Sequence, residues 1–73
     1  MVKLYILNHS RHSQDATELL RQSGVSFEIV DASEPVLLSR IDIELGITKL
    51  PALLTPDSMY QGVDEIRTFV NHS

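Results

Sequence analysis

The chain has 73 residues, a formal net charge of −4 at pH 7 and no cysteine. A chain this short buries only about 60% of its unfolded surface, so we interpret residues 1–73 as a single domain. The lack of cysteine excludes disulfide bonds and thiolate metal sites. The six Lys and Arg residues are scattered, and this disfavours nucleic acid as a partner, because phosphate binding needs clustered basic side chains.

The apolar segments of the chain are all short. None approaches the roughly 20 residues that a helix needs to cross a bilayer. The apolar start at residues 2–7 is interrupted by Asn8-His9 and is too short for a secretory signal. We therefore expect a soluble, cytoplasmic and monomeric protein without a membrane partner.

The first half of the chain predicts a strand, a helix and a second strand. Residues 3–7 are rich in strand formers and are followed by the turn-prone segment 8–10. From 11 to 23 the apolar residues recur at helical spacing. Ser10 or Ser13 can cap the start of this helix, and Gly24 can cap its end. The next strand is expected over 25–30, stopped by Asp31. The residues expected to face the core are Ala16, Leu19 and Leu20 in the helix and Phe27 and Ile29 in the strand.

The second half predicts a helix, a hairpin and a last helix. The segment 33–35 is a helix start with proline near the first turn, and Gly46 is the stop. Strands are expected over 52–55 and 59–61, joined by the turn residues 56–58, and Gly62 breaks the second of them. The expected buried residues are Leu37 or Leu38, Ile41 and Leu45 in the first helix and Val63, Ile66, Phe69 and Val70 in the second.

This order of elements, βαβ-α-ββα, indicates an α/β fold. Two parallel strands joined by a right-handed crossover, followed by a hairpin in the same sheet, give a four-stranded mixed sheet. Helices must cover both faces of such a sheet to bury its apolar strands. We expect the first and third helices on one face and the second helix on the other.

Five segments in this order resemble the glutaredoxin family over essentially the whole chain. Val2-Lys3-Leu4-Tyr5, Ser10-Arg11-His12-Ser13 and Ser23-Gly24-Val25-Ser26-Phe27 are similar to the opening of bacterial glutaredoxins, where the four-residue motif is Cys-Pro-Tyr-Cys. Lys49-Leu50-Pro51 resembles the family's Thr-Val-Pro, and Gln61-Gly62-Val63-Asp64-Glu65 resembles Gly-Gly-Cys-Asp-Asp. Lys49-Leu50-Pro51 is also similar to NrdH-type redoxins. The resemblance implies a thioredoxin-like (glutaredoxin) fold.

The resemblance also implies a role for each matching residue. Ser10 stands at the position of the nucleophilic cysteine and Ser13 at that of the resolving cysteine. Pro51 would follow a cis peptide bond, the backbone of Leu50 would pair with an extended peptide such as glutathione, and Asp64 would hold the glutathione amino group. The groove is expected to be framed by Arg11, His12, Leu50, Pro51, Val63 and Asp64. Implied partners are glutathione or a disulfide-containing protein, with no tightly bound cofactor.

The two serines separate this chain from the chemistry of the family. A helix N-terminus stabilises a thiolate, which carries disulfide exchange, whereas a serine hydroxyl neither ionises near neutral pH nor forms a disulfide. As written, the chain is expected to be redox-inactive: either a Cys-to-Ser variant or a natural relative that lost its thiols. The alternative function is a non-catalytic domain that binds glutathione or a peptide. Leu7 replaces a lysine common in the family, and Arg11 or Lys49 could supply that charge.

Other interpretations of the same residues stay open. Ser10-Arg11-His12-Ser13 is also similar to the Ser-Pro-Phe-Ser of plant glutathione transferases, which need a second, helical domain. Ser10 with His9, His12 and Asp15 is compatible with a hydrolase, and His9, His12 and His72 with a metal site, although no metal is expected. Both serines could serve only as helix caps, and Asp64 and Glu65 only as partners of a helix dipole.

Overall fold

The computed structural model describes residues 2–8 and 10–72. Its elements, in chain order, are β1 (Lys3–Ile6), α1 (Arg11–Ser23), β2 (Glu28–Asp31), α2 (Pro35–Leu45), β3 (Ala52–Leu54), β4 (Met59–Gln61) and α3 (Val63–Asn71). All the helices within these residues are too short or too polar to span a membrane. The order of these strands and helices along the chain confirms the order that the sequence predicts.

The four strands form one mixed sheet in the order β2-β1-β3-β4. β1 pairs with β2 in parallel, from Lys3 opposite Glu28 to Ile6 opposite Asp31. β1 and β3 are antiparallel, as are β3 and β4. This is the four-stranded mixed sheet that the sequence predicts, with its crossover between β1 and β2 and its hairpin between β3 and β4.

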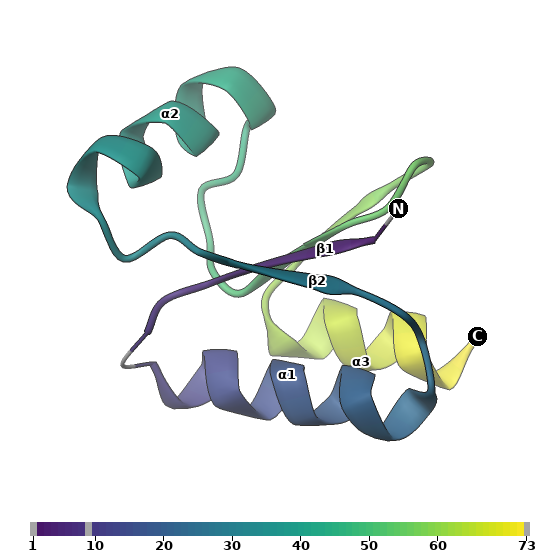
Figure 1. The fold of residues 1–73 in the computed structure, drawn as a ribbon. Coiled ribbons are helices and arrows are strands. Elements are labelled where there is room, and N and C mark those ends of the chain that lie inside the picture. The colour runs from purple at the N-terminus through teal and green to yellow at the C-terminus, as the bar shows by residue number, and fades with distance from the viewer. Residues whose placement is uncertain (1, 9, 73) are drawn as a thin grey trace.

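Helices cover both faces of the sheet, with α1 and α3 side by side on one face and α2 on the other (Figure 1). Successive strand residues point to opposite faces, so each strand contributes to two cores. The core under α1 and α3 is built from Leu4, Ala16, Leu20, Leu53 and Ile66. The core under α2 is built from Tyr5, Ala32, Ile41, Ile47 and Ala52. The predicted placement of the three helices is confirmed.

Helix α1 begins and ends where its capping residues predict. Ser10 is the N-cap, and its hydroxyl accepts a hydrogen bond from the Ser13 N–H at 3.4 Å. Gly24 ends the helix in the left-handed region at φ 81°, where glycine carries no steric penalty. Of the two serines proposed as caps, Ser10 takes this role.

The second strand differs from its prediction at both ends. Its parallel partner β1 begins at Lys3, opposite Glu28, so residues 25–27 lead up to the sheet without belonging to it. Asp31, expected as the stop, is the last strand residue and pairs with Ile6. Ile29, expected to face inward, is 44% exposed, because β2 is an edge strand.

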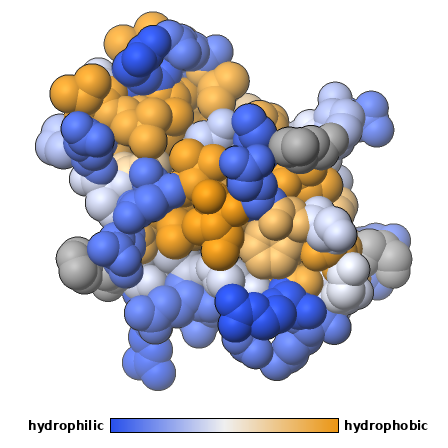
Figure 2. Space-filling view, in the orientation of Figure 1, coloured by the Kyte–Doolittle hydropathy of each residue, from blue (hydrophilic) through white to orange (hydrophobic). Residues whose placement is uncertain are grey.

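Helix α2 is the most exposed of the three helices. Pro35 occupies its first turn and Gly46 its left-handed C-cap, as predicted. Ile41 is its only buried residue, and Leu45, expected in the buried stripe, is 36% exposed. Val36 and Ile43 face solvent, and apolar side chains gather over α2 in the space-filling view (Figure 2).

Candidate functional site

The two serines at the start of α1 lie in different surroundings. Ser10 is partly exposed, whereas Ser13 is 1% exposed. The Ser13 hydroxyl accepts a hydrogen bond from the Leu7 N–H at 3.0 Å, and the Ser10 N–H donates to the Leu7 carbonyl at 3.0 Å. Both serines therefore tie the end of β1 to the first turn of α1, with Ser10 toward solvent and Ser13 toward the interior.

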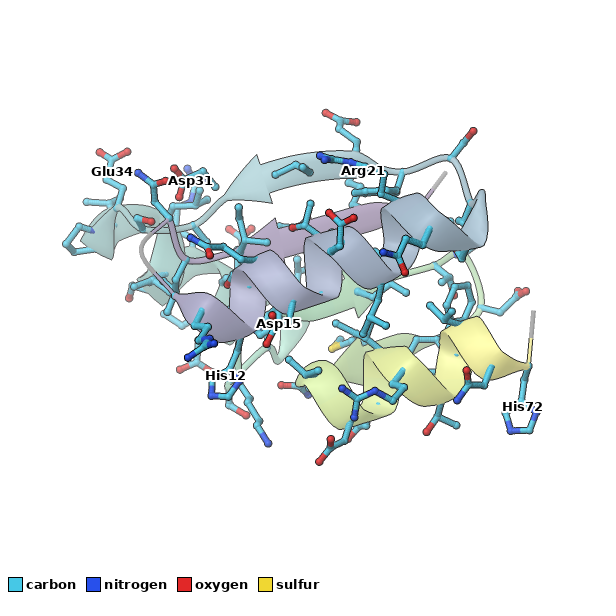
Figure 3. All side chains as sticks on the ribbon, turned by 90° about the horizontal axis from the view of Figure 1, so that it is seen from below. His12, Asp15, Arg21, Asp31, Glu34 and His72 are labelled. Atoms are coloured by element: carbon cyan, nitrogen blue, oxygen red, sulfur yellow. The ribbon has the colours of Figure 1, made fainter. Side chains whose placement is uncertain are left out.

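A groove of 170 Å³ lies beside this first turn. Three segments far apart in the sequence contribute to it. The lining residues are His12 from α1, Lys49, Leu50 and Pro51 from the segment before β3, and Gly62, Val63 and Asp64 from the start of α3. His12 projects from α1 on the side away from β2, toward the side where α3 lies (Figure 3).

The segment before β3 is held in place by the start of α3. The Leu50–Pro51 peptide bond is cis, as the resemblance implies, and Pro51 is fully buried. The Pro51 carbonyl accepts a hydrogen bond from the Gly62 N–H at 2.7 Å. The Gln61 side-chain oxygen accepts hydrogen bonds from the N–H groups of Thr48 at 3.0 Å and Lys49 at 3.1 Å. These bonds fix one wall of the groove against the other.

Gly62 brings the Lys49 side chain close to the start of α3. The glycine has φ 89° and ψ 161°, a region that only glycine adopts readily. A Cβ atom there would lie 3.0 Å from Lys49 Cε and 3.1 Å from Lys49 Nζ. The ammonium therefore sits against the N-terminus of α3, whose first N–H groups have no carbonyl partner within the helix and carry partial positive charge. This end of the groove favours an anion.

The two acidic residues in the first turn of α3 have different contacts. Glu65 accepts a hydrogen bond from the Gln61 N–H at 3.0 Å, which ties the helix to the end of β4. The Asp64 side chain is 99% exposed and lies 3.5 Å from the Arg67 guanidinium. Both acids lie where the helix dipole favours them, and the Asp64 carboxylate is open to a ligand at the groove rim.

The structure thus brings together His12, Leu50, Pro51, Val63 and Asp64, all predicted from the resemblance. Ser10, Arg11 and Ser13 do not line this groove; they lie in the turn that carries His12. The parts that the sequence analysis missed are the Gln61 side chain, which holds residues 48 and 49, and the positive φ of Gly62. The glycine in Gln61-Gly62-Val63 is the sequence signal from which this positive φ could have been predicted.

The hydrolase and metal interpretations gain no support from the described residues. The Ser10 hydroxyl accepts from the Ser13 N–H, and no hydrogen bond joins it to His12 within ranges 2–8 and 10–72. His12 lies at the start of α1, whereas His72 lies at the end of α3 (Figure 3). Across that same part of the chain, no three His, Asp or Glu side chains are placed to hold a metal ion. His9 lies outside the described residues.

Comparison with known proteins gives structural matches only. No protein-family model matches the chain, and no curated protein sequence does. Among solved structures, the glutaredoxin from Archaeoglobus fulgidus is 19% identical with a TM-score of 0.75, covering 94% of this chain and 84% of its own. The glutaredoxin from Brucella melitensis is 22% identical with a TM-score of 0.77, covering 99% of this chain and 79% of its own.

The glutaredoxin-like protein NrdH-redoxin from Escherichia coli is 15% identical with a TM-score of 0.78, covering 97% of this chain and 91% of its own. All three structures share with this chain an α/β arrangement whose sheet and helices superpose over nearly its full length. The chain therefore has the thioredoxin-like fold of the glutaredoxins.

Proposed function

We propose that this chain is a glutaredoxin-like thiol–disulfide oxidoreductase domain in which serine replaces both reactive cysteines, so that it keeps the substrate groove without the electron transfer. The observation that carries the proposal is the groove itself. It joins the first turn of α1, the segment ending in cis Pro51 and the start of α3, and those three places hold three of the segments that resemble the family, 10–13, 49–51 and 61–65.

The different burial of the two serines supports this proposal. Disulfide exchange needs one accessible thiolate that attacks and a second thiol that resolves the mixed disulfide. Ser10, at the proposed nucleophile position, is partly exposed at the helix N-terminus, and Ser13, at the proposed resolving position, is buried one turn further on. Cysteines placed here would therefore divide these roles as the reaction requires.

The groove also offers the polar groups that a short acidic peptide needs. Glutathione carries two carboxylates and one amino group. Lys49 and the N-terminus of α3 supply positive charge for a carboxylate, and the exposed Asp64 carboxylate suits the amino group. We propose that glutathione, or the glutathione-like end of a mixed disulfide, binds here with its backbone along Leu50.

Restoring the cysteines tests the redox part of the proposal. The Ser10→Cys, Ser13→Cys double variant is expected to reduce a small disulfide with glutathione and glutathione reductase as the electron source, two glutathione molecules being oxidised for each disulfide reduced. The matched control is Ser23→Cys with Ser26→Cys, which has the same spacing at the opposite end of α1. Equal rates in the two variants, or no activity in the first with an unchanged circular dichroism spectrum, would refute the redox assignment.

Titration of the unmodified chain with reduced glutathione tests the binding part. We expect saturable NMR shifts at the amides of His12, Leu50 and Asp64. Lys49→Glu is expected to weaken binding by about three- to tenfold through loss of an ion pair, while the same charge reversal at Lys3, in β1, leaves it unchanged. A titration without saturable shifts at these amides would contradict the proposal that the groove binds glutathione.

A further inference from the structure

One edge of the sheet, formed by β2, is open to solvent. Three of the four residues of β2 are exposed, and the described residues add no strand beyond it. The strand at the opposite edge, β4, has only half-buried residues. Its last residue, Gln61, donates its N–H to Glu65 in the first turn of α3. The two edges therefore differ, and β2 is the edge to which a further strand can be added.

The backbone of β2 offers hydrogen-bonding groups on its outer side. The Glu28 N–H donates to the Val2 carbonyl at 2.9 Å, and the Ala32 N–H donates to the Ile6 carbonyl at 2.7 Å. Because successive residues of a strand direct these groups to opposite sides, the N–H and C=O of Ile29, in the middle of β2, point away from β1. No strand lies on that side within residues 2–8 and 10–72, so this edge presents a template for pairing with another chain.

A groove of 270 Å³ lies along the same edge, between β2 and the flank of α1; we call it the β2 groove. Its apolar lining includes Ile6 of β1 and Ile29 of β2, and its charged residues Glu18 and Arg21 lie 3.8 Å apart. The Ile29 side chain points to this side of the sheet, since Phe27, two positions earlier, packs against the core under α1 and α3. An aliphatic side chain that an added strand places next to Ile29 would cover its exposed surface and close the open side of the β2 groove.

The charge of this edge is negative. The segment 22–39 contains three acidic residues, Glu28, Asp31 and Glu34, and no Lys or Arg. Glu28 lies at the start of β2, whereas Asp31 and Glu34 lie at its end (Figure 3). Lys3 is opposite Glu28 in β1, yet in the part of the chain that the structure describes no ion pair involves Glu28 or Glu34. The edge therefore favours a strand with a basic residue toward each of its ends.

A second copy of the chain does not provide such a strand. Antiparallel pairing of two β2 edges joins residues whose backbone groups point outward, so Ile29 of each copy would lie opposite the other, and Phe27 opposite Asp31. This register brings Asp31 and Glu34 of one copy close to Glu28 of the other, with no Lys or Arg of the segment 22–39 between them. Like charges placed close together across a strand pair are destabilising, so the edge is better suited to a different protein.

We infer that the β2 edge binds a strand of a partner protein, antiparallel to β2, with an aliphatic residue opposite Ile29 and basic residues opposite Glu28 and Asp31. The main chain of the partner exchanges two hydrogen bonds with Ile29, as in other strand additions to a sheet edge. Its aliphatic side chain covers Ile29 beside the β2 groove, and its basic side chains meet the two acidic ends. The inference does not depend on the proposed function, because β1 separates this edge from β3 and β4, whose ends border the groove proposed to bind glutathione.

The probe is a fluorescein-labelled, end-blocked hexapeptide, Ser-Lys-Thr-Ile-Lys-Val, whose binding to the unmodified chain is measured by fluorescence anisotropy. Its lysines lie opposite Asp31 and Glu28 when its isoleucine is opposite Ile29. The comparison peptide Ser-Glu-Thr-Ile-Glu-Val is expected to bind about tenfold more weakly, because like charges then meet. The probe with an N-methylated isoleucine keeps its charges but cannot donate to the Ile29 carbonyl, and is also expected to bind at least tenfold more weakly. Equal binding of the probe and its N-methylated form would overturn the inference, since charge alone would then explain the affinity.

Proline at position 29 tests the backbone pairing. Ile29→Pro removes the outward N–H but leaves the bonds of Glu28 and Ala32 to β1, and proline is tolerated on such an edge. It is expected to weaken binding of the probe at least tenfold with an unchanged circular dichroism spectrum. The control Ile29→Val keeps the N–H and a β-branched side chain, and is expected to keep the binding. Equal binding to the two variants would contradict the inference.

Charge reversal at position 28 tests the acidic end and decides the matter if Ile29→Pro fails to fold. Glu28→Lys is expected to lower the preference for the lysine peptide over the glutamate peptide at least threefold, because one of the two favourable pairs is lost. The control Glu44→Lys changes the net charge equally on the exposed side of α2 and is expected to leave the preference unchanged. The same preference in both variants would mean that the peptide does not meet the β2 edge.

Two further measurements place the partner on the molecule. NMR shifts caused by the probe at the amides of residues 28–31, with none at Leu50 and Asp64, support the inference. Shifts at Leu50 and Asp64 instead would assign the peptide to the groove proposed for glutathione and overturn the inference alone. A concentration-dependent dimer in analytical ultracentrifugation that Ile29→Pro abolishes would assign the edge to a second copy of the chain, which also overturns it.

Discussion

At the scale of single residues, Gly62 decides how the groove closes. Its backbone adopts φ 89° and ψ 161°, so that its N–H reaches the Pro51 carbonyl and the chain turns at once into α3. The missing side chain leaves room for Lys49. The same glycine thus permits both the joint between two walls of the groove and the position of its basic group.

Gly62→Ala is expected to destabilise the fold by about 1–3 kcal/mol, because alanine is strained at this φ and ψ and its Cβ would displace Lys49. Urea unfolding followed by circular dichroism measures the change. Gly24→Ala is the control, since Gly24 also has a positive φ but no atom within 4 Å of the added Cβ; a loss of about 1–2 kcal/mol is expected there. Weaker glutathione binding is expected for Gly62→Ala alone. A smaller loss at Gly62 than at Gly24 would contradict this role.

At the scale of elements, α2 differs from α1 and α3. Helices α1 and α3 pack against each other and share one core with the sheet, whereas α2 covers its face alone, with Ile41 as its buried anchor. Its outward face carries Val36 at 65% and Ile43 at 81% exposure. The attachment of α2 therefore depends on very few side chains.

Ile41→Ala is expected to lower the free energy of unfolding by about 2–4 kcal/mol through loss of buried apolar volume. Ile43→Ala makes the same chemical change two positions along the same helix, at an exposed site. It is expected to change stability by less than about 0.5 kcal/mol. Chemical denaturation of both variants tests the contrast, and equal losses would mean that α2 does not bury Ile41 as described.

At the scale of the whole molecule, one sheet separates two unequal cores. Among the described residues, the core under α1 and α3 has five buried members, to which Phe27, Tyr60 and Phe69 add partly buried rings, with Tyr60 and Phe69 5.0 Å apart between centroids. The core under α2 contains the small residues Ala32 and Ala52 among its five. The α1–α3 face is therefore the more cohesive half.

Amide hydrogen exchange is expected to follow this division, because local opening involves the regions with fewest buried apolar contacts. Amides in the middle of α2 are expected to exchange at least about tenfold faster than those in the middle of α1, measured by NMR in deuterated buffer. The outer turns of all helices serve as the reference for fraying. Equal protection of α1 and α2 would show that the two cores open together.

Local signals along the chain are enough to predict the order of elements and several residues of the candidate groove. Apolar periodicity and capping residues placed all seven elements, because these signals act over a few neighbouring residues: Ser10 and Gly24 bound α1, and Gly46 ends α2. The resemblance then named five of the residues that line the groove, and the cis bond before Pro51.

Features that depend on partners distant in the chain could not be predicted from such local signals. The start of β2 is set by its pairing with β1, and the exposure of Ile29 and Leu45 by how far the neighbouring layers extend over them. The hydrogen bonds that the Gln61 side chain accepts from residues 48 and 49 join positions more than ten residues apart in the sequence. A groove between α2 and the segment that leads into β3 stays open because Ile41 is the one residue that α2 buries. Periodicity shows which residues share a face, but packing alone determines how completely that face is covered.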